Sequence, residues 1–335
     1  MRAYEIRSFG LEHLTAFERP EPEPGPYQVR VRVRAASLNY RDLLMVRGLY
    51  NPKQKLPLIP CSDGAGVVEA VGPEVRRVKV GDRVMGAFAQ GWLAGEPTRA
   101  KLSSTLGGPL DGALAEAMLL HEDGLVHTPA HLSDEEAATL PCAGVTAWSA
   151  LVTHGVLRAG ETVLVQGTGG VSLFALQFAK VLGARVIATS SKDEKLERAK
   201  KLGADEGINY ASTPEWDKPA RALTEGLGPH QVIEVGGAGT LQRTLKCIRV
   251  GGTISLIGVL GGNAAEVNLI PILMQNVRVQ GILVGHREAF EQMCRAISQH
   301  KLRPVVDRVF EFGQAREAFE HLASGAHFGK IVVRI

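Results

Sequence analysis

Between residues 162 and 284 the chain alternates short apolar runs with segments of helical spacing, and this alternation restricts the possible folds more than any other feature. Strands that alternate with helices predict a parallel sheet with helices packed on both faces. The apolar runs cover residues 162–166, 184–189, 207–210, 231–235, 253–258 and 278–284. Six such strands are typical of a dinucleotide-binding unit. We therefore predict an α/β protein with a doubly wound, parallel six-stranded sheet.

A glycine-rich turn joins the first of these strands to the first helix of the unit. Its residues are Gly167, Thr168, Gly169, Gly170, Val171 and Ser172. Gly167 permits a tight turn, and Gly169 lets the backbone approach a pyrophosphate that the helix N-terminus attracts. A small residue, Ser172, replaces the last glycine of the usual pattern, so a turn without a ligand is the alternative. The strand before the turn and the helix after it favour a cofactor site.

The end of the second strand indicates which dinucleotide binds. An NAD-selective site usually places Asp or Glu there to bind the ribose hydroxyls, whereas this strand ends in Ser190 and Ser191. Both hydroxyls can bond to a 2′-phosphate, and Lys192 or Lys195 can neutralise it. Alternatively, Lys195 belongs to a solvated helix face. The pattern favours NADP over NAD.

The first 125 residues or so are predicted to be β-rich. Residues 28–34 alternate apolar and polar side chains with period two, as a half-buried strand does, and residues 67–71 and 82–85 indicate further short strands. The proline-rich segment 20–26 is expected to be extended, and residues 89–112 to form a long surface loop. From about residue 129 the pattern changes to strands alternating with helices, and after residue 285 the chain is expected to return to the first domain.

Composition excludes several classes of protein. With 38 basic and 35 acidic residues the formal net charge is only +3, so nucleic acid and anionic membranes are not expected partners. No apolar run reaches the roughly 18–20 residues that a membrane span needs. The first ten residues carry charges and no apolar core, so we expect no secretory signal. Four widely spaced cysteines argue against a disulfide framework and fit a reducing, cytoplasmic compartment.

Five short motifs lie along the chain. They read ASLNYRD at 36–42, CSDGAGVV at 61–68, VGDRV at 80–84, ATLP at 138–141 and GTGGV at 167–171. Together they resemble the medium-chain dehydrogenase/reductase superfamily, and within it the zinc-lacking, quinone-oxidoreductase-like branch, whose nearest subgroup is often labelled zinc-type alcohol dehydrogenase-like. The resemblance implies a GroES-like β-rich catalytic domain (1–128 and 287–335) and a Rossmann-fold domain (129–286).

Three positions test whether a catalytic zinc is expected. In that superfamily the ion needs a Cys, a His and a further Cys from separate segments, and the matching residues here are Asn39, Ser62 and Cys142. An amide, a hydroxyl and one thiol are not the thiolate and imidazole donors that Zn²⁺ prefers. Asp63 retains the acid beside the usual His, and Cys61 is expected to point elsewhere. We therefore expect no metal.

The resemblance also implies cofactor contacts outside the glycine-rich turn. Ser191, Lys195 and Tyr210 match positions around the 2′-phosphate and adenosine of NADP. The wall beside the nicotinamide ribose corresponds to Val235, Gly236, Ile257 and Gly258, and the carboxamide contact to the backbone of Val284 and Gly285. Thr146 matches a residue under the nicotinamide ring, and Lys330 matches one near the pyrophosphate.

Without a metal, no Lewis acid polarises a carbonyl or acidifies an alcohol. The superfamily's Ser/Thr–His relay for alcohols is absent too, because Arg41 and Leu44 stand at its positions. The reduction of quinones and enones depends less on such groups. Asn39, Tyr50 and Thr146 are the candidate hydrogen-bond donors to the oxygen anion that develops on these acceptors. Tyr50 is alternatively a half-exposed loop aromatic.

The sequence thus predicts a zinc-independent NADPH-dependent quinone or enone reductase acting on a small molecule. Alcohol or aldehyde oxidoreduction is one alternative, and a non-enzymatic, crystallin-like or RNA-binding role is the other. The strand at 278–284 is expected at the edge of its sheet, where an exposed apolar edge favours a homodimer. The resemblance implies the same contact.

Overall fold

The computed structural model describes all residues from 1 to 335. The chain forms two compact units, the first made of Met1–Val145 and Gly285–Ile335, the second of Thr146–Val284. The first boundary between the two units differs most from the expected one. The structure places it after residue 145, whereas the sequence predicts it after residue 128. The assignment of a catalytic and a cofactor-binding function to the two parts stays a prediction.

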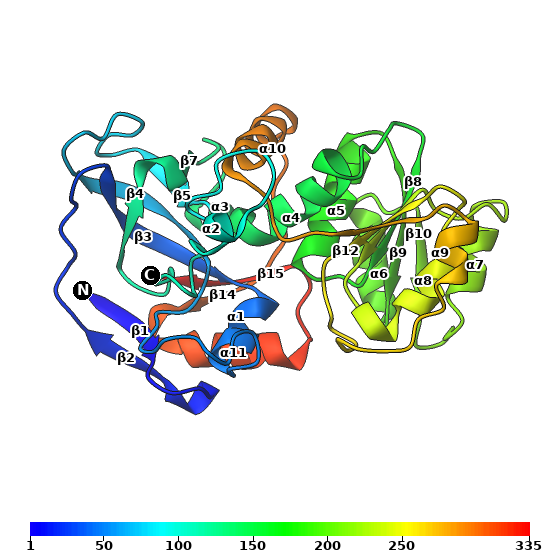
Figure 1. Cartoon of the computed structure of the whole chain (residues 1–335), viewed down its shortest axis with the longest axis horizontal. Coiled ribbons are helices and arrows are strands. Elements are labelled where there is room, and N and C mark those ends of the chain that lie inside the picture. The colour runs from blue at the N-terminus through cyan, green and yellow to red at the C-terminus, as the bar shows by residue number, and fades with distance from the viewer. The chain divides into compact units, whose positions relative to one another are not determined.

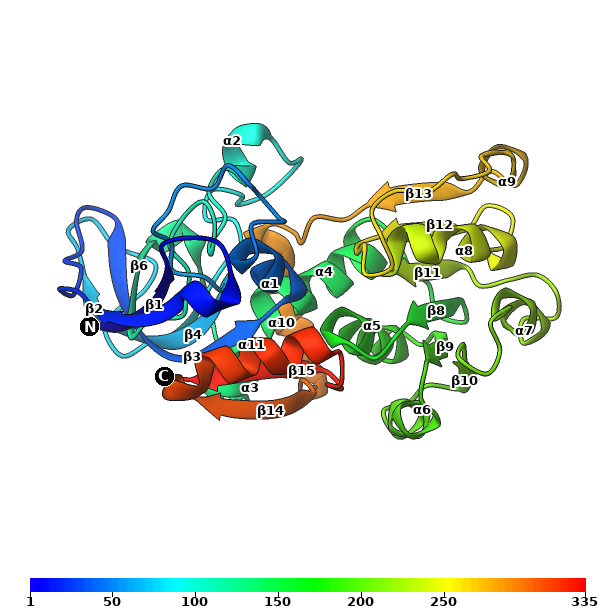
Figure 2. The ribbon, with the colours of Figure 1, turned by 90° about the horizontal axis from the view of Figure 1, so that it is seen from below.

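The second unit contains the predicted sheet. Its strands are β8 (Thr162–Gln166), β9 (Arg185–Ser190), β10 (Glu206–Asn209), β11 (Gln231–Glu234), β12 (Thr253–Leu256) and β13 (Arg278–Gly281). All neighbours pair in parallel, in the order β10-β9-β8-β11-β12-β13, which Figure 2 shows from one edge to the other. The chain reverses its direction of winding between β8 and β11, as a doubly wound sheet requires. The predicted fold class is confirmed.

Helices cover this sheet because its strands are apolar on both faces. They are α5 (Gly170–Val181), α6 (Asp193–Lys201), α7 (Asp217–Ala222), α8 (Leu241–Cys247) and α9 (Ile270–Met274), and they flank the strands in Figure 1. Helix α5 packs on β8 and β9, and α6 packs on β9 and β10. Leu164, Ile187 and Val232 from the strands form one buried cluster with Trp216 and Leu245, which come from the α7 and α8 region. Burial on both faces explains the continuous apolar runs in the sequence.

The first unit is built on a seven-stranded sheet. Its strands are β3 (Gln28–Leu38), β4 (Asp63–Val71), β5 (Arg83–Gly86), β6 (Ala117–His121), β7 (Leu125–His127), β14 (Val306–Glu311) and β15 (Lys330–Arg334). The order is β14-β15-β3-β4-β5-β7, and β6 pairs with the first half of β3. Strands β1 (Arg2–Ile6) and β2 (Leu14–Glu18) form a separate antiparallel pair. Since β15 pairs with β3, the C-terminus of the chain lies beside the strand that leads into Asn39.

Short helices connect and cover these strands. They are α1 (Tyr40–Val46), α2 (Arg99–Leu102), α3 (Asp134–Ala138), α10 (Arg287–His300) and α11 (Ala315–Ser324), and α4 (Val145–Trp148) lies at the crossing between the units. Ser133 caps α3 in a reciprocal pair with Glu136. Within the long segment 89–112, α2 is the only helix and no strand forms.

None of the helices is both long and apolar enough to cross a membrane.

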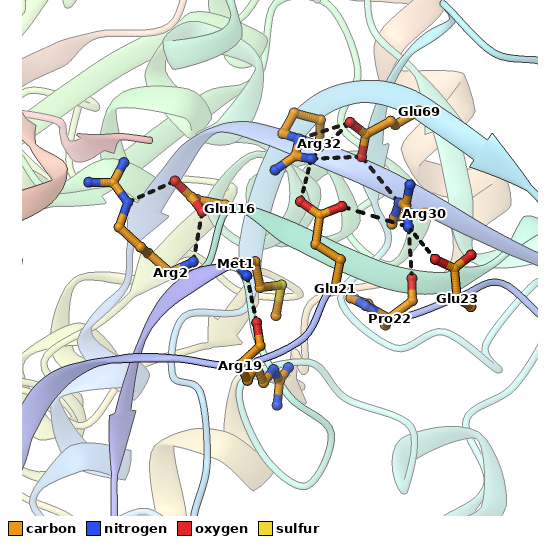
Figure 3. Close-up of polar contacts among 10 residues, drawn as sticks. All are labelled: Met1, Arg2, Arg19, Glu21, Pro22, Glu23, Arg30, Arg32, Glu69 and Glu116. Atoms are coloured by element: carbon orange, nitrogen blue, oxygen red, sulfur yellow. Dashed lines mark hydrogen bonds and ion pairs between the residues drawn. The ribbon is translucent and has the colours of Figure 1, made fainter.

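The proline-rich segment 20–26 is held by charges on β3. Period-two alternation buries Val29, Val31 and Val33, and it leaves the arginines between them on the opposite face. Figure 3 shows Arg30 and Arg32 bonded to Glu69 of β4 and also to the proline-rich segment, where Arg32 donates to Glu21. The arginine pair therefore holds an extended segment that has no strand partner of its own.

Candidate functional site

A buried polar cluster lies where β3 ends and β4 begins. Asn39 caps α1, with its backbone N–H donating to Asp42 Oδ2 at 2.8 Å. The Asn39 Nδ2 group donates weakly to Ser62 Oγ at 3.4 Å, and Ser62 Oγ donates to Asp63 Oδ1 at 2.7 Å. The antiparallel register places Ser37 opposite Asp63, so the two strands bring these side chains together. Two of the residues at positions that match the superfamily's zinc ligands, Asn39 and Ser62, therefore contact each other directly.

Lys330 supplies the positive charge of this cluster. It is the first residue of β15, which pairs with the end of β3, and its side chain is only 4% exposed. Its Nζ donates to the backbone oxygen of Leu38 and, at 2.6 Å, to Asn39 Oδ1. This contact fixes the Asn39 amide with its oxygen toward the ammonium group and its Nδ2 toward Ser62. The expected role of Lys330 near a pyrophosphate stays a prediction.

Cys142 and Asp63 complete the cluster. The backbone N–H of Cys142 donates to Asp63 Oδ2 at 3.1 Å. Burial raises the pKa of the Cys142 thiol and of the Cys61 thiol, so both are protonated near neutral pH. Burial also raises the pKa of Asp63 to about 6, although the Lys330 ammonium acts in the opposite direction. The two hydrogen bonds from Ser62 and Cys142 therefore only partly offset the cost of burying the Asp63 carboxylate.

The chemistry of these donors does not match a zinc site. The Asn39 oxygen is bonded to a cation, the Ser62 hydroxyl donates to a carboxylate, and Cys142 is the only one of the three residues that has a sulfur ligand. Zn²⁺ prefers thiolate and neutral imidazole nitrogen, and an ammonium group at this position repels it. No three His, Cys, Asp or Glu side chains of the chain are grouped so that they could hold a metal ion.

Tyr50 lies against Arg41, a residue whose role the sequence did not reveal. The guanidinium carbon of Arg41 lies 4.9 Å from the centre of the Tyr50 ring and 5.3 Å from that of Phe88. Arg41 Nη1 donates to Asp42 Oδ1 and to the backbone oxygens of Leu106 and Gly107. Tyr50 is 43% exposed, so its outer surface is open while the inner one stacks on a buried cation.

The glycine-rich turn of the second unit has the shape of a phosphate cradle. Gly167 has a φ of +73°, and a Cβ atom added at Gly167 or Gly169 would meet nothing within 4 Å. Gly169 caps the 12-residue helix α5 without any side-chain hydrogen bond, so the first N–H groups of the helix are open to an anion. Ser172 Oγ donates to the backbone oxygen of Gln166 at 2.6 Å and closes the turn. These residues fit a dinucleotide phosphate.

The residues expected around a 2′-phosphate gather at the ends of β9 and β10. Ser190 is the last residue of β9, and the backbone N–H of Tyr210 donates to its oxygen at 3.0 Å. Ser191 and Tyr210 are exposed, and Lys195 follows in the first turn of α6. The parallel register of β9 and β10 explains this gathering, which puts two hydroxyls and an ammonium group on one edge.

The remaining predicted positions follow strand ends, except Thr146, which lies in helix α4. Val235 and Gly236 follow β11, Ile257 and Gly258 follow β12, Val284 ends the second unit and Gly285 begins the C-terminal part of the first, and Thr146 is the first residue of the second unit. Val284 has a φ of +52°, which is unusual for a β-branched residue. The sequence analysis missed Glu234, a buried acid at the end of β11. The signal in the sequence is an acidic residue directly after the apolar pair Val232 and Ile233.

Family models match most of the chain. A model described as "Alcohol dehydrogenase GroES-like domain" matches residues 25–130, and one described as "Zinc-binding dehydrogenase" matches residues 170–299. A zinc-type alcohol dehydrogenase-like protein of Schizosaccharomyces pombe is 48% identical over 308 residues, which cover 90% of this chain and 89% of that protein. A quinone oxidoreductase of Pseudomonas aeruginosa is 40% identical over 236 residues, covering 70% of this chain and 66% of that protein.

Solved structures share the whole fold. A putative alcohol dehydrogenase from Sinorhizobium meliloti superposes with a TM-score of 0.92 at 46% identity, covering 100% of this chain and 98% of the other. A mycobacterial protein in complex with NADPH gives a TM-score of 0.84 at 27% identity, with both chains covered completely. An alcohol dehydrogenase from Pyrobaculum aerophilum with bound cobalt and zinc gives 0.86 at 29% identity, covering 100% of this chain and 99% of the other.

Proposed function

This chain belongs to the medium-chain dehydrogenase/reductase superfamily, and from that premise we propose that it is a zinc-independent reductase that uses NADPH to reduce a quinone, an enone or a similar carbonyl acceptor. It is an oxidoreductase of the alcohol dehydrogenase-like and quinone oxidoreductase-like type. Substrate class, NADPH preference and zinc independence are the proposed parts. The four cysteines are unpaired, which supports a proposed location in the reducing cytoplasm.

One observation carries the zinc-free proposal. The Lys330 ammonium bonds to Asn39 at a position where the superfamily's metal enzymes have a zinc ligand, and a serine and a single thiol stand at the other two positions. The cluster therefore contains its own cation near the buried Asp63, while the neighbouring Asp42 is paired with Arg41. Alcohol oxidation needs a group that acidifies the hydroxyl, and none of the clustered residues does so. Reduction of an electron-poor acceptor has no such requirement.

The proposed chemistry assigns a small set of tasks to this chain. When bound, NADPH supplies a hydride, so that NADPH, the acceptor and one proton give NADP⁺ and the reduced acceptor. The open helix N-terminus at Gly169 binds the pyrophosphate, and Asn39, whose Nδ2 makes only a long hydrogen bond of 3.4 Å to Ser62, serves as a donor to the acceptor oxygen. Tyr50 offers the open face of its ring to a planar acceptor. Thr146 is a further proposed donor.

A turnover screen tests this proposal against alcohol and aldehyde oxidoreduction, which the names of several relatives favour. NADPH and NADH are each assayed with 1,4-benzoquinone, 2-cyclohexen-1-one and benzaldehyde, and NADP⁺ and NAD⁺ with primary and secondary alcohols, all with and without a zinc chelator. The expected result is chelator-resistant oxidation of NADPH by the quinone or the enone. Chelator-sensitive alcohol oxidation as the main activity would contradict it.

Replacing Lys195 by alanine is expected to weaken NADPH binding about ten- to hundred-fold and to leave NADH binding nearly unchanged. One charge-assisted contact contributes roughly 1.5–3 kcal/mol, and only NADPH carries the 2′-phosphate. Ser190→Asp is expected to shift preference toward NADH, because a carboxylate there repels the phosphate and binds a ribose hydroxyl. Fluorescence titration of both cofactors measures this, with Lys201→Ala in the last turn of α6 as control. Equal affinity of the wild type for NADH and NADPH would contradict the proposed site.

A homodimer through the β13 edge is expected. Strand β13 pairs only with β12, and it exposes Val279 at the edge of the sheet. Helix α9, which precedes β13 in the chain, exposes Ile270, Leu273 and Met274, with Leu273 79% exposed, and exposed apolar side chains next to an edge strand favour a second copy. Sedimentation should show a dimer for the wild type and for Leu227→Asp, which alters an exposed leucine elsewhere, and a monomer for Leu273→Asp/Val279→Lys. A monomeric wild type at micromolar concentration would exclude this assembly.

A further inference from the structure

A buried carboxylate lies at the point where the sheet of the second unit changes its winding direction. Glu234 ends β11 and Gln166 ends the adjacent strand β8, so both reach the carboxyl edge between these two strands. In doubly wound sheets, ligands bind in the crevice outside this edge. Glu234 has no exposed surface at all, and neither Lys nor Arg bonds to it. A buried charge without a cation needs strong compensation by other donors.

Five hydrogen bonds supply that compensation. Glu234 Oε1 accepts from the backbone N–H groups of Gly236 and Gly237, at 2.9 and 3.0 Å, and from the Thr240 hydroxyl. Glu234 Oε2 accepts from Gln166 Nε2 at 2.7 Å and from the Thr244 hydroxyl. Every donor except Gln166 belongs to the turn after β11 or to the helix that follows. The carboxylate therefore determines the path of residues 236–240.

Gln166 joins this turn to the phosphate cradle. Its Oε1 accepts from the backbone N–H groups of Val235 and Gly236, and its backbone oxygen accepts from Ser172 in the first turn of α5. Gly167, the first residue of the cradle, follows it directly in the chain. One buried pair thus fixes the two turns that lie on either side of the change in winding direction.

We propose that Glu234 and Gln166 are positioning residues that hold the turn after β11 against the nicotinamide half of the bound cofactor. This inference rests on the proposed NADPH-binding function. The adenosine half lies over the second strand of such a sheet, here β9, so the other half extends across β8 toward β11 and β12. The pair contacts the turn on the nicotinamide side and no residue of the predicted 2′-phosphate site.

The polarity of the pair makes the proposal testable with isosteric variants. In Glu234→Gln, the new amide nitrogen faces Gln166 Nε2, so two donors oppose each other. If Gln166 turns its amide to relieve this, its nitrogen then faces the N–H groups of Val235 and Gly236 instead. In Gln166→Glu/Glu234→Gln, the carboxylate accepts from Val235, Gly236 and the new amide, so every hydrogen bond has a donor and an acceptor again.

Titration calorimetry with NADPH and with adenosine 2′,5′-bisphosphate, which lacks the nicotinamide half, is the test. For Glu234→Gln we expect NADPH affinity to fall roughly tenfold and bisphosphate affinity to change less than about twofold, because one mispaired buried donor costs about that much. The double variant should recover NADPH affinity, and Glu206→Gln, a change at the far end of β10, should affect neither ligand. Should Glu234→Gln not fold, Thr240→Ala replaces it with the same expected selectivity.

An equal loss of both ligands in Glu234→Gln would overturn the inference, since it indicates general loosening of the unit. Unchanged NADPH affinity, or no recovery in the double variant, would overturn it too. A wild-type protein that binds neither NADPH nor NADH would instead overturn the proposed function on which the inference rests.

Discussion

Lys330→Met is expected to lower the free energy of unfolding by about 3–5 kcal/mol, the usual cost of removing one partner from a buried charge cluster. Lys330 is 4% exposed, its ammonium group bonds to Leu38 and Asn39, and its charge lowers the cost of the buried Asp63 carboxylate. Methionine keeps the length of the side chain and removes only the charge and the donors. Urea unfolding at pH 7, followed by fluorescence, measures the change.

Two control variants separate charge balance from packing. Lys330→Met/Asp63→Asn removes both charges and should recover much of the loss, because a neutral replacement of a whole buried pair is often nearly as stable. Lys180→Met breaks a surface contact with Asp205 and should cost less than about 1 kcal/mol. If Lys330→Met is as stable as Lys180→Met, Lys330 does not hold the cluster together.

Asp63→Asn is expected to change how stability depends on pH. The pKa of Asp63 is raised to about 6 in the folded protein from an ordinary value of 3.8, so between these values the folded state holds a proton that the unfolded chain releases. This contribution to stability is therefore complete below about pH 4, falls as the pH rises and is lost above about pH 6. It corresponds to about 3 kcal/mol, at about 1.4 kcal/mol for each unit of pKa.

The measurement is the difference between the two proteins in urea unfolding from pH 4 to pH 8. Carboxylates whose pKa is lowered in the fold, such as Glu116 and Asp307, act in the opposite direction but equally in both proteins, so they cancel. Relative to the wild type, Asp63→Asn should gain stability as the pH rises from about 4 to about 6. A difference that does not vary with pH would show that the folded protein does not shift this pKa.

The architecture could be predicted from the sequence because local patterns determine it. Each of the six apolar runs corresponds to a strand of the second unit, and the central strands β8, β9 and β11 are apolar because both of their faces are buried. The alternation at 28–34 likewise identifies the half-buried part of β3. The glycine-rich turn was also recognisable in the sequence. Gly167 has a positive φ that few other residues adopt, so a glycine at this position indicates a tight turn between the strand and the helix.

Element boundaries were less predictable because partners far along the chain set them. Strand β3 continues to Leu38 since β15 and β4 pair with its second half, and β15 lies almost 300 residues later. The same limit applies to the candidate site. Nothing near Lys330 in the sequence indicates that its ammonium group bonds to Asn39, and nothing near Gln166 indicates Glu234 as its partner. The residue types alone show that Asn39 and Ser62 are poor zinc ligands. Which groups they contact could be learned only from the structure.

The most direct test of the central claim is the zinc content of active protein. Protein purified without added metal is treated with a zinc chelator, its bound zinc is measured by elemental analysis, and the same sample is assayed for NADPH oxidation by 1,4-benzoquinone. An amide, a hydroxyl and one thiol, from Asn39, Ser62 and Cys142, are not the set of thiolates and imidazole that Zn²⁺ prefers, so we expect far less than one zinc ion per chain with activity retained. One zinc ion per chain that resists the chelator, or activity that disappears with the zinc and returns when it is added, would contradict the account.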